Sequence, residues 1–288
     1  MAVAIDIDKD LCIKCGKCVK VCPSKIFIQD ENSKDISTQF VESCIVCGHC
    51  VAACPEDAVL HSEFPAEKVH RIDYSQLPTP EQMMLLCKAR RSNRAFSSKQ
   101  IPEESLKMIL EAAHRAPTGS NVQHVKFLLI TNPEKLRQVT EFTMGVFGDT
   151  LKKLKNPLIK PFIKFIMPDA LRYIPVFERL SDDYRNGGDG ILRKATAVIF
   201  IYTPGKSRMG SMDANLAYQN GSLMAESLGV SQFYTGFVLN ASKMKKGKLE
   251  ELFGIEGEIH AGMALGMPVF RFPNYIDRKE IDVINFFS

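Results

Sequence analysis

The sequence lacks several features that would place it in other protein classes. Its 288 residues include no tryptophan, and no stretch reaches the roughly 18 uncharged apolar residues that a membrane-spanning helix needs. The first residues, Met1–Asp6, have neither the basic start nor the long apolar core of a secretory signal peptide. We therefore expect neither an integral membrane protein nor an exported one, and we expect a cytoplasmic location.

Charge and glycine patterns argue against two further classes. Residues 1–78 carry 8 Lys+Arg and 12 Asp+Glu, whereas the remainder carries 29 and 21, which indicates two units of opposite net charge. The basic remainder is too sparse in Lys and Arg to indicate a nucleic-acid partner. No GxGxxG segment follows a predicted strand and no P-loop occurs, so no dedicated Rossmann domain is expected.

Cysteine is concentrated at one end of the chain. Eight of the nine cysteines lie within the first 54 residues, in two copies of the pattern CxxCxxCxxxCP that are offset by 32 residues. In two-cluster ferredoxin runs of this kind, the fourth cysteine of each run binds the cluster of the other run. The predicted ligands of the first 4Fe–4S cluster are Cys12, Cys15, Cys18 and Cys54. The predicted ligands of the second are Cys44, Cys47, Cys50 and Cys22.

Two other uses of these cysteines are weaker. Disulfides are rare in a reducing cytosol, and zinc sites favour two separated CxxC pairs. Gly16 and Gly48 follow the second cysteine of each run, where the backbone must curl tightly and a Cβ would obstruct it. His49 lies inside the second run, and we expect it to tune the hydrogen bonding of a cluster because the thiolate set is already complete.

The chain as a whole divides into two domains and a connector. We predict a two-cluster ferredoxin-type domain at 1–64, a linker at 65–80 and a second domain at 81–288. Few large apolar residues accompany the cysteine runs, so the clusters should supply cross-links that a small core cannot. In the linker, Leu77–Pro80 is expected to be extended or turning because two prolines occur within it.

The second domain opens with a predicted helix at 81–90, on which Cys87 is expected to be a small buried residue. The segment RRSNRAF follows, and its guanidinium groups and hydroxyl suit a phosphate, although a solvated basic loop would look the same. A helix at 103–116 and the polar loop APTGSNVQH come next, before a predicted strand at 126–130. Further on we predict a strand at 195–202 and a helix at 213–228.

RRSNRAF followed by APTGSNVQ resembles the FMN-dependent nitroreductase family over residues 83–288, and residues 3–62 resemble a bacterial 2×4Fe–4S ferredoxin. The resemblance implies an α+β fold: a two-cluster ferredoxin-like domain and a sandwich whose mostly antiparallel sheet is flanked by helices. It also implies an intertwined homodimer with FMN at the subunit interface, and low-potential electron transfer typical of anaerobic cells.

Carried over by position, the resemblance implies which residues contact FMN. The residues for its phosphate, ribityl chain and ring edge are Arg90, Ser92 and Arg94, with the backbone of Arg91. The loop that the partner subunit places beside the flavin ring is matched by Pro117, Thr118, Gly119 and Asn121. The turn facing flavin N5 is matched by Thr235 and Gly236. The basic residue completing the phosphate site is Arg278, with Arg271 as a second candidate.

The chain departs from the family near the ligand. Gln123-His124-Val125 stands where the family often has Gln-Pro-Trp, and His124 is the candidate proton donor, with a hydrogen-bonded loop histidine as the alternative. The stretch 151–167 mixes apolar and basic residues with Pro157 and Pro161. It is expected to be a lid or dimer-packing excursion rather than a membrane-surface helix, which these prolines would break. Asp182–Tyr184 is expected to be a solvated loop.

These parts predict an FMN-dependent oxidoreductase that passes electrons from two 4Fe–4S clusters to FMN and on to a small nitroaromatic, quinone or enone-like acceptor. A redox partner such as ferredoxin would supply the electrons, and direct reduction by NAD(P)H stays open. Two alternatives use the same parts. One is an electron-transfer protein with a protein acceptor and FMN as a relay, and the other is a flavin-binding protein without turnover.

Overall fold

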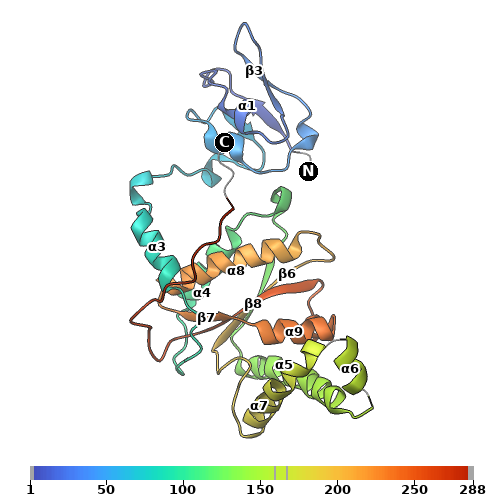
Figure 1. Ribbon diagram of the computed structural model, residues 1–288. Helices are drawn as coiled ribbons and strands as arrows, with labels where there is room; N and C mark the ends of the chain where they lie inside the picture. Colours follow the sequence, from blue (N-terminus) through green and yellow to red (C-terminus); the bar gives the residue numbers. More distant parts are fainter. Residues whose placement is uncertain (1–2, 159, 167, 285–288) are drawn as a thin grey trace. The chain divides into compact units, whose positions relative to one another are not determined.

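The computed structural model describes residues 3–158, 160–166 and 168–284. The outermost residues of the predicted domains, 1–2 and 285–288, lie outside these ranges, as do Ile159 and Met167 of the basic apolar stretch. The chain forms two compact units (Figure 1). The first contains Met1–Leu77 with Gly119–Gln123, and the second contains Pro78–Thr118 with His124–Ser288.

The first unit repeats one small motif. Strand β1 (Ile5–Ile7) pairs antiparallel with β4 (Val59–His61), and β2 (Phe27–Gln29) pairs antiparallel with β3 (Ile36–Thr38). Each cysteine run contains one short helix, α1 (Lys17–Val21) or α2 (His49–Ala53). Gly16 (φ +68°) and Gly48 (φ +71°) precede these helices in the left-handed conformation that favours glycine, as expected from the sequence.

The second unit is built on a four-stranded sheet in the order β5-β6-β8-β7. Its strands are β5 (Lys126–Ile130), β6 (Ala197–Thr203), β8 (Glu258–Gly266) and β7 (Ser231–Tyr234). All three pairings are antiparallel, with Lys126 opposite Tyr202 and Ser231 opposite Gly266 at their ends. The predicted α+β class with an antiparallel sheet is therefore confirmed.

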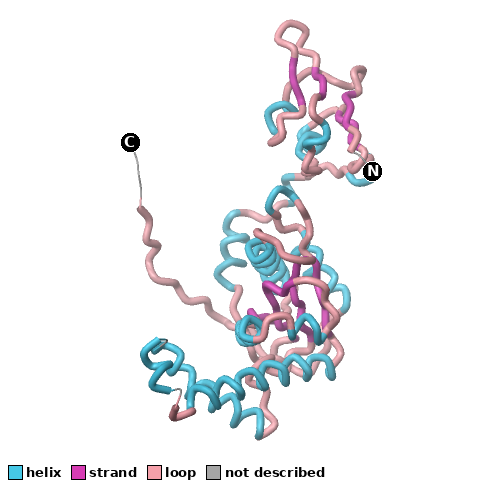
Figure 2. The backbone as a smooth tube through the Cα atoms, turned by 90° about the vertical axis from the view of Figure 1, so that its right-hand side faces the viewer, coloured by secondary structure: helices cyan, strands magenta, loops and turns pink. Residues whose placement is uncertain are grey.

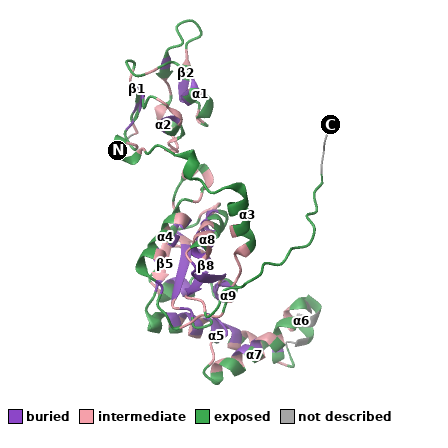
Figure 3. Cartoon of the chain, turned by 90° about the vertical axis from the view of Figure 1, so that its left-hand side faces the viewer, coloured by how far each residue is buried: buried purple, intermediate pink, exposed green. Residues whose placement is uncertain are grey.

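Helices cover both faces of this sheet because successive strand side chains point to opposite sides. Ile199 and Ile201 pack with α4 (Glu103–His114) and α8 (Gly210–Ser227). Val198 and Phe200 pack with α5 (Pro133–Lys155) and α9 (Gly236–Met244). Figure 2 shows helices around the strands of this unit, and Figure 3 shows that β8 is buried.

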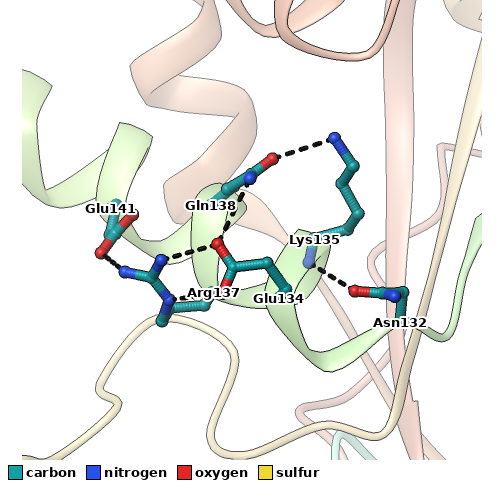
Figure 4. A network of polar contacts seen from close by, with 6 residues as sticks. All are labelled: Asn132, Glu134, Lys135, Arg137, Gln138 and Glu141. Atoms are coloured by element: carbon teal, nitrogen blue, oxygen red, sulfur yellow. Dashed lines mark hydrogen bonds and ion pairs between the residues drawn. The ribbon is translucent and has the colours of Figure 1, made fainter.

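The helix α5 begins with a network of polar contacts (Figure 4). The Asn132 side chain caps the helix by accepting the backbone N–H of Lys135 at 3.1 Å. Arg137 then bridges Glu134 and Glu141 on consecutive turns. These contacts stabilise the N-terminal turns of the 23-residue helix α5, which packs against one face of the sheet.

After α5, the chain forms α6 (Lys160–Ile166), η5 (Pro168–Tyr173) and α7 (Ile174–Arg185). The helix α5 stops at Lys155, two residues before Pro157, and Pro161 lies in the first turn of α6, where proline is tolerated. The prediction that Asp182–Tyr184 forms a loop is wrong, because these residues lie in α7, whose apolar face is buried at Phe177 and Leu180.

The second unit begins with α3 (Pro80–Ala89), where Thr79 and Gln82 form a capping box. Leu77 and Thr79 are extended, as predicted. The expectation that Cys87 is buried is wrong: it is exposed, because α3 buries none of its residues. The remaining helices are α10 (Lys248–Leu252), η1 (Val41–Ser43), η2 (Ala66–Lys68), η3 (Tyr74–Gln76) and η4 (Gly119–Asn121).

Candidate functional site

Four cysteines of the first unit line one small hollow. They are the predicted first-cluster set: Cys12, Cys15, Cys18 and Cys54. The hollow is closed by the apolar side chains of Ile7 and Ile36 together with the backbone at Gly16. Four sulfurs around one enclosed space are the donor set that a 4Fe–4S cluster requires.

The cysteines of the second predicted set also lie close together, although Cys22 belongs to the first run and the others to the second. Burial raises the pKa of Cys50 to about 11, and the thiols of Cys22 and Cys47 push it further in that direction. Burial likewise raises the pKa of Cys18, with Cys12 and Cys15 as its neighbours. Thus each central cysteine is near thiols of its own predicted set. None of the nine cysteines forms a disulfide.

Backbone N–H groups point at sulfur in both runs. Ile26 N–H donates to Cys22 Sγ at 3.4 Å, and Ala58 N–H donates to Cys54 Sγ at 3.2 Å. The two donors are 32 residues apart, as are the two acceptors. The repeat in sequence therefore produces a repeat in hydrogen bonding.

A histidine also contacts a sulfur, and it is not the predicted one. His61 Nε2 lies 3.6 Å from Cys44 Sγ, whereas His49 is exposed at the start of α2. Burial lowers the pKa of His61, and the carboxylate of Glu63 opposes that shift. His61 was missed because it stands seven residues beyond the last cysteine of its run.

In the second unit, the segment after α3 contacts β7 and the part of the chain that follows β8. Ser92 forms a parallel bridge with Gln232, and Arg94 lies 5.3 Å from the centre of the Phe233 ring. The buried Asn93 side chain donates to the Phe270 carbonyl oxygen at 2.9 Å. Ser92 and Arg94 are thereby held on one strand of the sheet.

Two tyrosines from α8 and β7 lie next to this segment. Burial raises the pKa of Tyr218 to about 12, while the guanidinium groups of Arg90 and Arg94 oppose that shift. The Tyr218 hydroxyl donates to Gln232 Oε1 at 2.7 Å, and its ring meets that of Tyr234 edge-on at 4.8 Å. The structure thus brings Arg90, Ser92 and Arg94 together with Tyr218 and Gln232, which the sequence did not single out.

Two buried polar atoms of β7 and its following turn lack a partner among the described residues. Within that part of the chain, Gln232, 1% exposed, has no acceptor for its Nε2, and Thr235, 2% exposed, has no partner for its Oγ1. Leaving such groups unpaired costs about 1–3 kcal/mol each, and buried polar groups are usually satisfied. Both atoms lie beside the arginine-rich segment, and a polar cofactor bound there would supply their missing hydrogen-bond partners.

The two C-terminal arginine candidates differ in their surroundings. Arg271 and Arg278 are both exposed, but Arg271 lines a cavity of about 260 Å³ with Arg91, Asn93 and Glu226. Burial raises the pKa of the Glu226 carboxyl, which accepts the Arg91 backbone N–H and has Arg271 nearby. Arg271 therefore lies near the Glu226 carboxyl at the end of α8.

The polar loop after α4 is divided between the units. Pro117 and Thr118 belong to the second unit, whereas Gly119 and Asn121 belong to the first. Asn121 Nδ2 donates to the Val46 carbonyl oxygen at 2.7 Å within the first unit. Gly236 opens α9, directly after Thr235.

His124, the candidate proton donor, has defined partners. Its Nε2 lies 3.1 Å from Ser207 Oγ and 3.6 Å from Oδ2 of the buried Asp213. A second histidine of this unit, His260, has its Nε2 2.8 Å from Thr203 Oγ1. These contacts fit the hydrogen-bonded loop histidine that was the alternative.

The basic apolar stretch buries Leu154 in the core of the second unit, whereas three of its later apolar side chains are exposed. Leu158, Phe162 and Phe165 are 86%, 72% and 90% exposed. No helix in the described ranges is long and apolar enough to cross a membrane.

Comparison with protein families gives two matches. Residues 87–267 match the nitroreductase family, and residues 4–55 match the 4Fe-4S dicluster domain. The first match spans more than half of the chain and includes the arginine segment, β7 and β8.

Individual relatives agree with this assignment. A protein of Archaeoglobus fulgidus named "Putative NADH dehydrogenase/NAD(P)H nitroreductase" is 25% identical over 195 residues, 65% of this chain and 86% of that protein. Two crystal structures of nitroreductases with bound FMN share the fold. That from Bacteroides fragilis has a TM-score of 0.51 at 21% identity, covering 71% of this chain and 99% of its own. That from Desulfitobacterium hafniense has a TM-score of 0.54 at 17% identity, covering 70% and 97%.

Proposed function

Because this chain belongs to the nitroreductase family and carries a 4Fe-4S dicluster domain in front of it, we propose an FMN-dependent oxidoreductase fed by two 4Fe–4S clusters. Electrons would enter singly through the clusters and leave in pairs from FMN to a small nitroaromatic, quinone or enone-like acceptor. The family assignment makes the chain an oxidoreductase of the nitroreductase type; the electron route and the acceptor class are the proposal.

The residues of the second unit fit FMN. The observation that carries the proposal is the pair of unpartnered buried atoms, Gln232 Nε2 and Thr235 Oγ1, on the strand and turn next to Ser92 and Arg94. Arg90 and Arg94 would neutralise the phosphate and hold the ring edge. When bound, FMN supplies the ability to accept electrons one at a time and to give up two together.

Several of this chain's residues would orient the cofactor without taking part in bond making. Tyr218 holds the Gln232 amide in place through its 2.7 Å bond, so that Nε2 is presented in one direction. Glu226 fixes the Arg91 backbone, and Asn93 fixes the segment to Phe270. Arg271 and Arg278, with Pro117, Thr118, Gly119, Asn121 and Gly236, remain proposed cofactor contacts.

The assembly proposed with this function is a homodimer. The chain after β8 carries exposed apolar side chains, including Ile276 at 73%, Ile281 at 87% and Ile284 at 81%. Exposed apolar surface is unfavourable at about 25 cal/mol per Å², and a second copy of the chain would cover it. A cytoplasmic location belongs to the same proposal.

The test is an anaerobic reduction experiment on the whole protein. Iron, sulfide and FMN are measured first, and FMN bleaching is then followed with reduced ferredoxin or with NAD(P)H as the only donor. We expect eight iron atoms and one FMN per chain, rapid bleaching by ferredoxin, and its loss in Cys12→Ser and Cys44→Ser.

The matched control is Cys87→Ser, which removes an exposed thiol outside both runs. It should bleach like the unchanged protein. Rapid bleaching by NAD(P)H that the two cluster variants leave untouched would contradict cluster entry. Bleaching without reduction of any small acceptor would instead favour a relay to a protein acceptor or a protein without turnover.

A further inference from the structure

The contact between His61 and Cys44 has a defined direction. His61 Nδ1 accepts the backbone N–H of Glu63 at 3.1 Å. Because Nδ1 accepts this bond it carries no proton, so the N–H of the ring is on Nε2, the nitrogen that lies 3.6 Å from Cys44 Sγ. The ring therefore donates an N–H···S hydrogen bond to a cysteine of the second predicted cluster set.

The ring is held firmly in this position. His61 is 6% exposed and ends β4, where it pairs with Ile5 of β1. The Phe64 ring packs on it with the centroids 4.8 Å apart. Strand pairing, ring contact and the Glu63 bond together fix where the Nε2 proton points.

The first predicted cluster set has no matching histidine. With the 32-residue offset, the counterpart of Cys44 is Cys12 and the counterpart of His61 is Gln29. Gln29 donates its side-chain amide to the carbonyl oxygens of Lys14 and Lys34 instead, at 2.8 and 3.0 Å. The symmetric backbone bonds, Ile26 to Cys22 and Ala58 to Cys54, give one donor to each set.

Cys44 receives a further donor, since Val46 N–H lies 3.4 Å from its sulfur. Hydrogen bonds to the sulfurs stabilise the more negative, reduced form of an iron–sulfur cluster and so raise its reduction potential. We propose that His61 is a positioning residue that raises the potential of the cluster bound by Cys44, so that the first electron accepted by the unit rests there. This inference rests on the proposed presence of two clusters.

The test is an equilibrium redox titration of the full chain with dithionite, in which each cluster takes up one electron and is followed by electron paramagnetic resonance. His61→Phe keeps a planar ring beside Phe64 and removes the N–H. We expect one of the two midpoint potentials to become more negative and the other to stay unchanged. His70→Phe, at an exposed histidine of the same unit, is the control and should change neither.

A second measurement needs no substitution. In unchanged protein grown with ¹⁵N-histidine, electron–nuclear double resonance of the first cluster to be reduced should show a coupled histidine nitrogen. Two unchanged potentials in a His61→Phe protein with eight iron atoms would overturn the inference. So would the lack of histidine coupling, even if His61→Phe failed to assemble. Absence of iron from the unchanged protein would instead refute the proposed function.

Discussion

At the level of single residues, the second unit has a buried polar group that the described residues do not satisfy. Gln232 is 1% exposed, and only its Oε1 has a partner, the Tyr218 hydroxyl. A glutamine placed only for packing would be a net cost, because the unpaired amide loses its hydrogen bonds to water. A residue with this property is expected where a ligand completes the site.

Replacing Gln232 separates cofactor binding from packing. Gln232→Leu removes the amide donor and should weaken FMN binding about tenfold or more, the equivalent of one lost buried hydrogen bond. Tyr218→Phe removes the same tyrosine–glutamine bond but keeps the donor, so it should weaken FMN much less. FMN dissociation constants measured by fluorescence decide between them, and equal affinities for the two variants would contradict the assignment.

A second residue-level prediction concerns acid stability. Burial lowers the pKa of His260 below its usual 6.5, and His124 acts in the same direction, while Glu258 and Glu250 oppose them. In the window below 6.5 the unfolded chain binds the proton more readily than the folded one, so stability falls as pH falls. His260→Asn should make the unfolding free energy of the second unit less dependent on pH between 6.5 and 5. Chemical unfolding at several pH values measures this, and an unchanged slope would be the contrary result.

At the level of elements, glycines in β8 allow neighbouring segments to lie directly on the strand. A Cβ at Gly266 would lie 2.6 Å from Phe96 Cδ1 and 3.0 Å from Phe96 Cβ. Phe96 ends the arginine segment and bridges to Pro268. The position of Arg90 and Arg94 therefore depends on a strand that is remote in sequence.

Gly266→Ala tests this dependence. Because the clash reaches the stem of Phe96 rather than the end of a flexible chain, we expect a loss of about 1–3 kcal/mol in unfolding free energy, together with weaker FMN retention. Gly145→Ala is the control: outside the nearby backbone of α5, no atom of the described residues lies within 4 Å of the new Cβ, which is in the middle of that helix. It should stabilise the protein by about 0.5–1 kcal/mol. A Gly266→Ala protein as stable and as yellow as the unchanged one would refute the argument.

At the level of the whole molecule, the two units differ in what holds them together. The core of the first unit consists of a few residues: Ile5, Ile7, Ile26, Phe27, Ile36, Val51 and Val59, with Cys18 and Cys50. The second unit has a packed layer on each side of its sheet. We therefore expect the first unit to need its clusters for folding and the second not to.

Removing iron should separate the two units in a proteolysis experiment. After anaerobic treatment with a chelator, a protease is expected to cut within residues 3–77 while a fragment containing β5 to β8 survives. Mass spectrometry of the fragments provides the measurement, with untreated protein as the control. Resistance of the first unit after complete loss of iron would show that its apolar core suffices.

The proposed dimer yields the last prediction. Ile281→Lys with Ile284→Lys places charges on two of the exposed apolar side chains after β8 and should shift the protein towards monomer. Light scattering coupled to size exclusion measures the mass. Lys279→Gln, an exposed change nearby, should leave the dimer intact. A dimer unaffected by both isoleucine changes would show that this segment is not at the interface.

Much of this organisation was readable from the amino-acid order alone. The two cysteine runs, the glycines that start α1 and α2, and the amphipathic helix α4 are local patterns with a direct physical cause. Cluster ligation and helix periodicity involve residues that are a few positions apart, so their spacing can be recognised in the sequence. The nitroreductase and ferredoxin resemblances rested on such local segments, and both were confirmed.

Tertiary structure decided which distant side chains meet. His61 reaches Cys44, 17 residues away, because β4 pairs with β1 and returns past the second run. Gln232 meets Ser92 because a parallel bridge joins segments 140 residues apart, and Glu226 meets Arg91 at the end of α8. No repeating pattern in the sequence predicts these contacts, because each depends on packing across the sheet or across the strand pair. The cofactor types were thus predicted from the sequence, while the residues proposed to orient the flavin or to tune a cluster could be identified only from the fold.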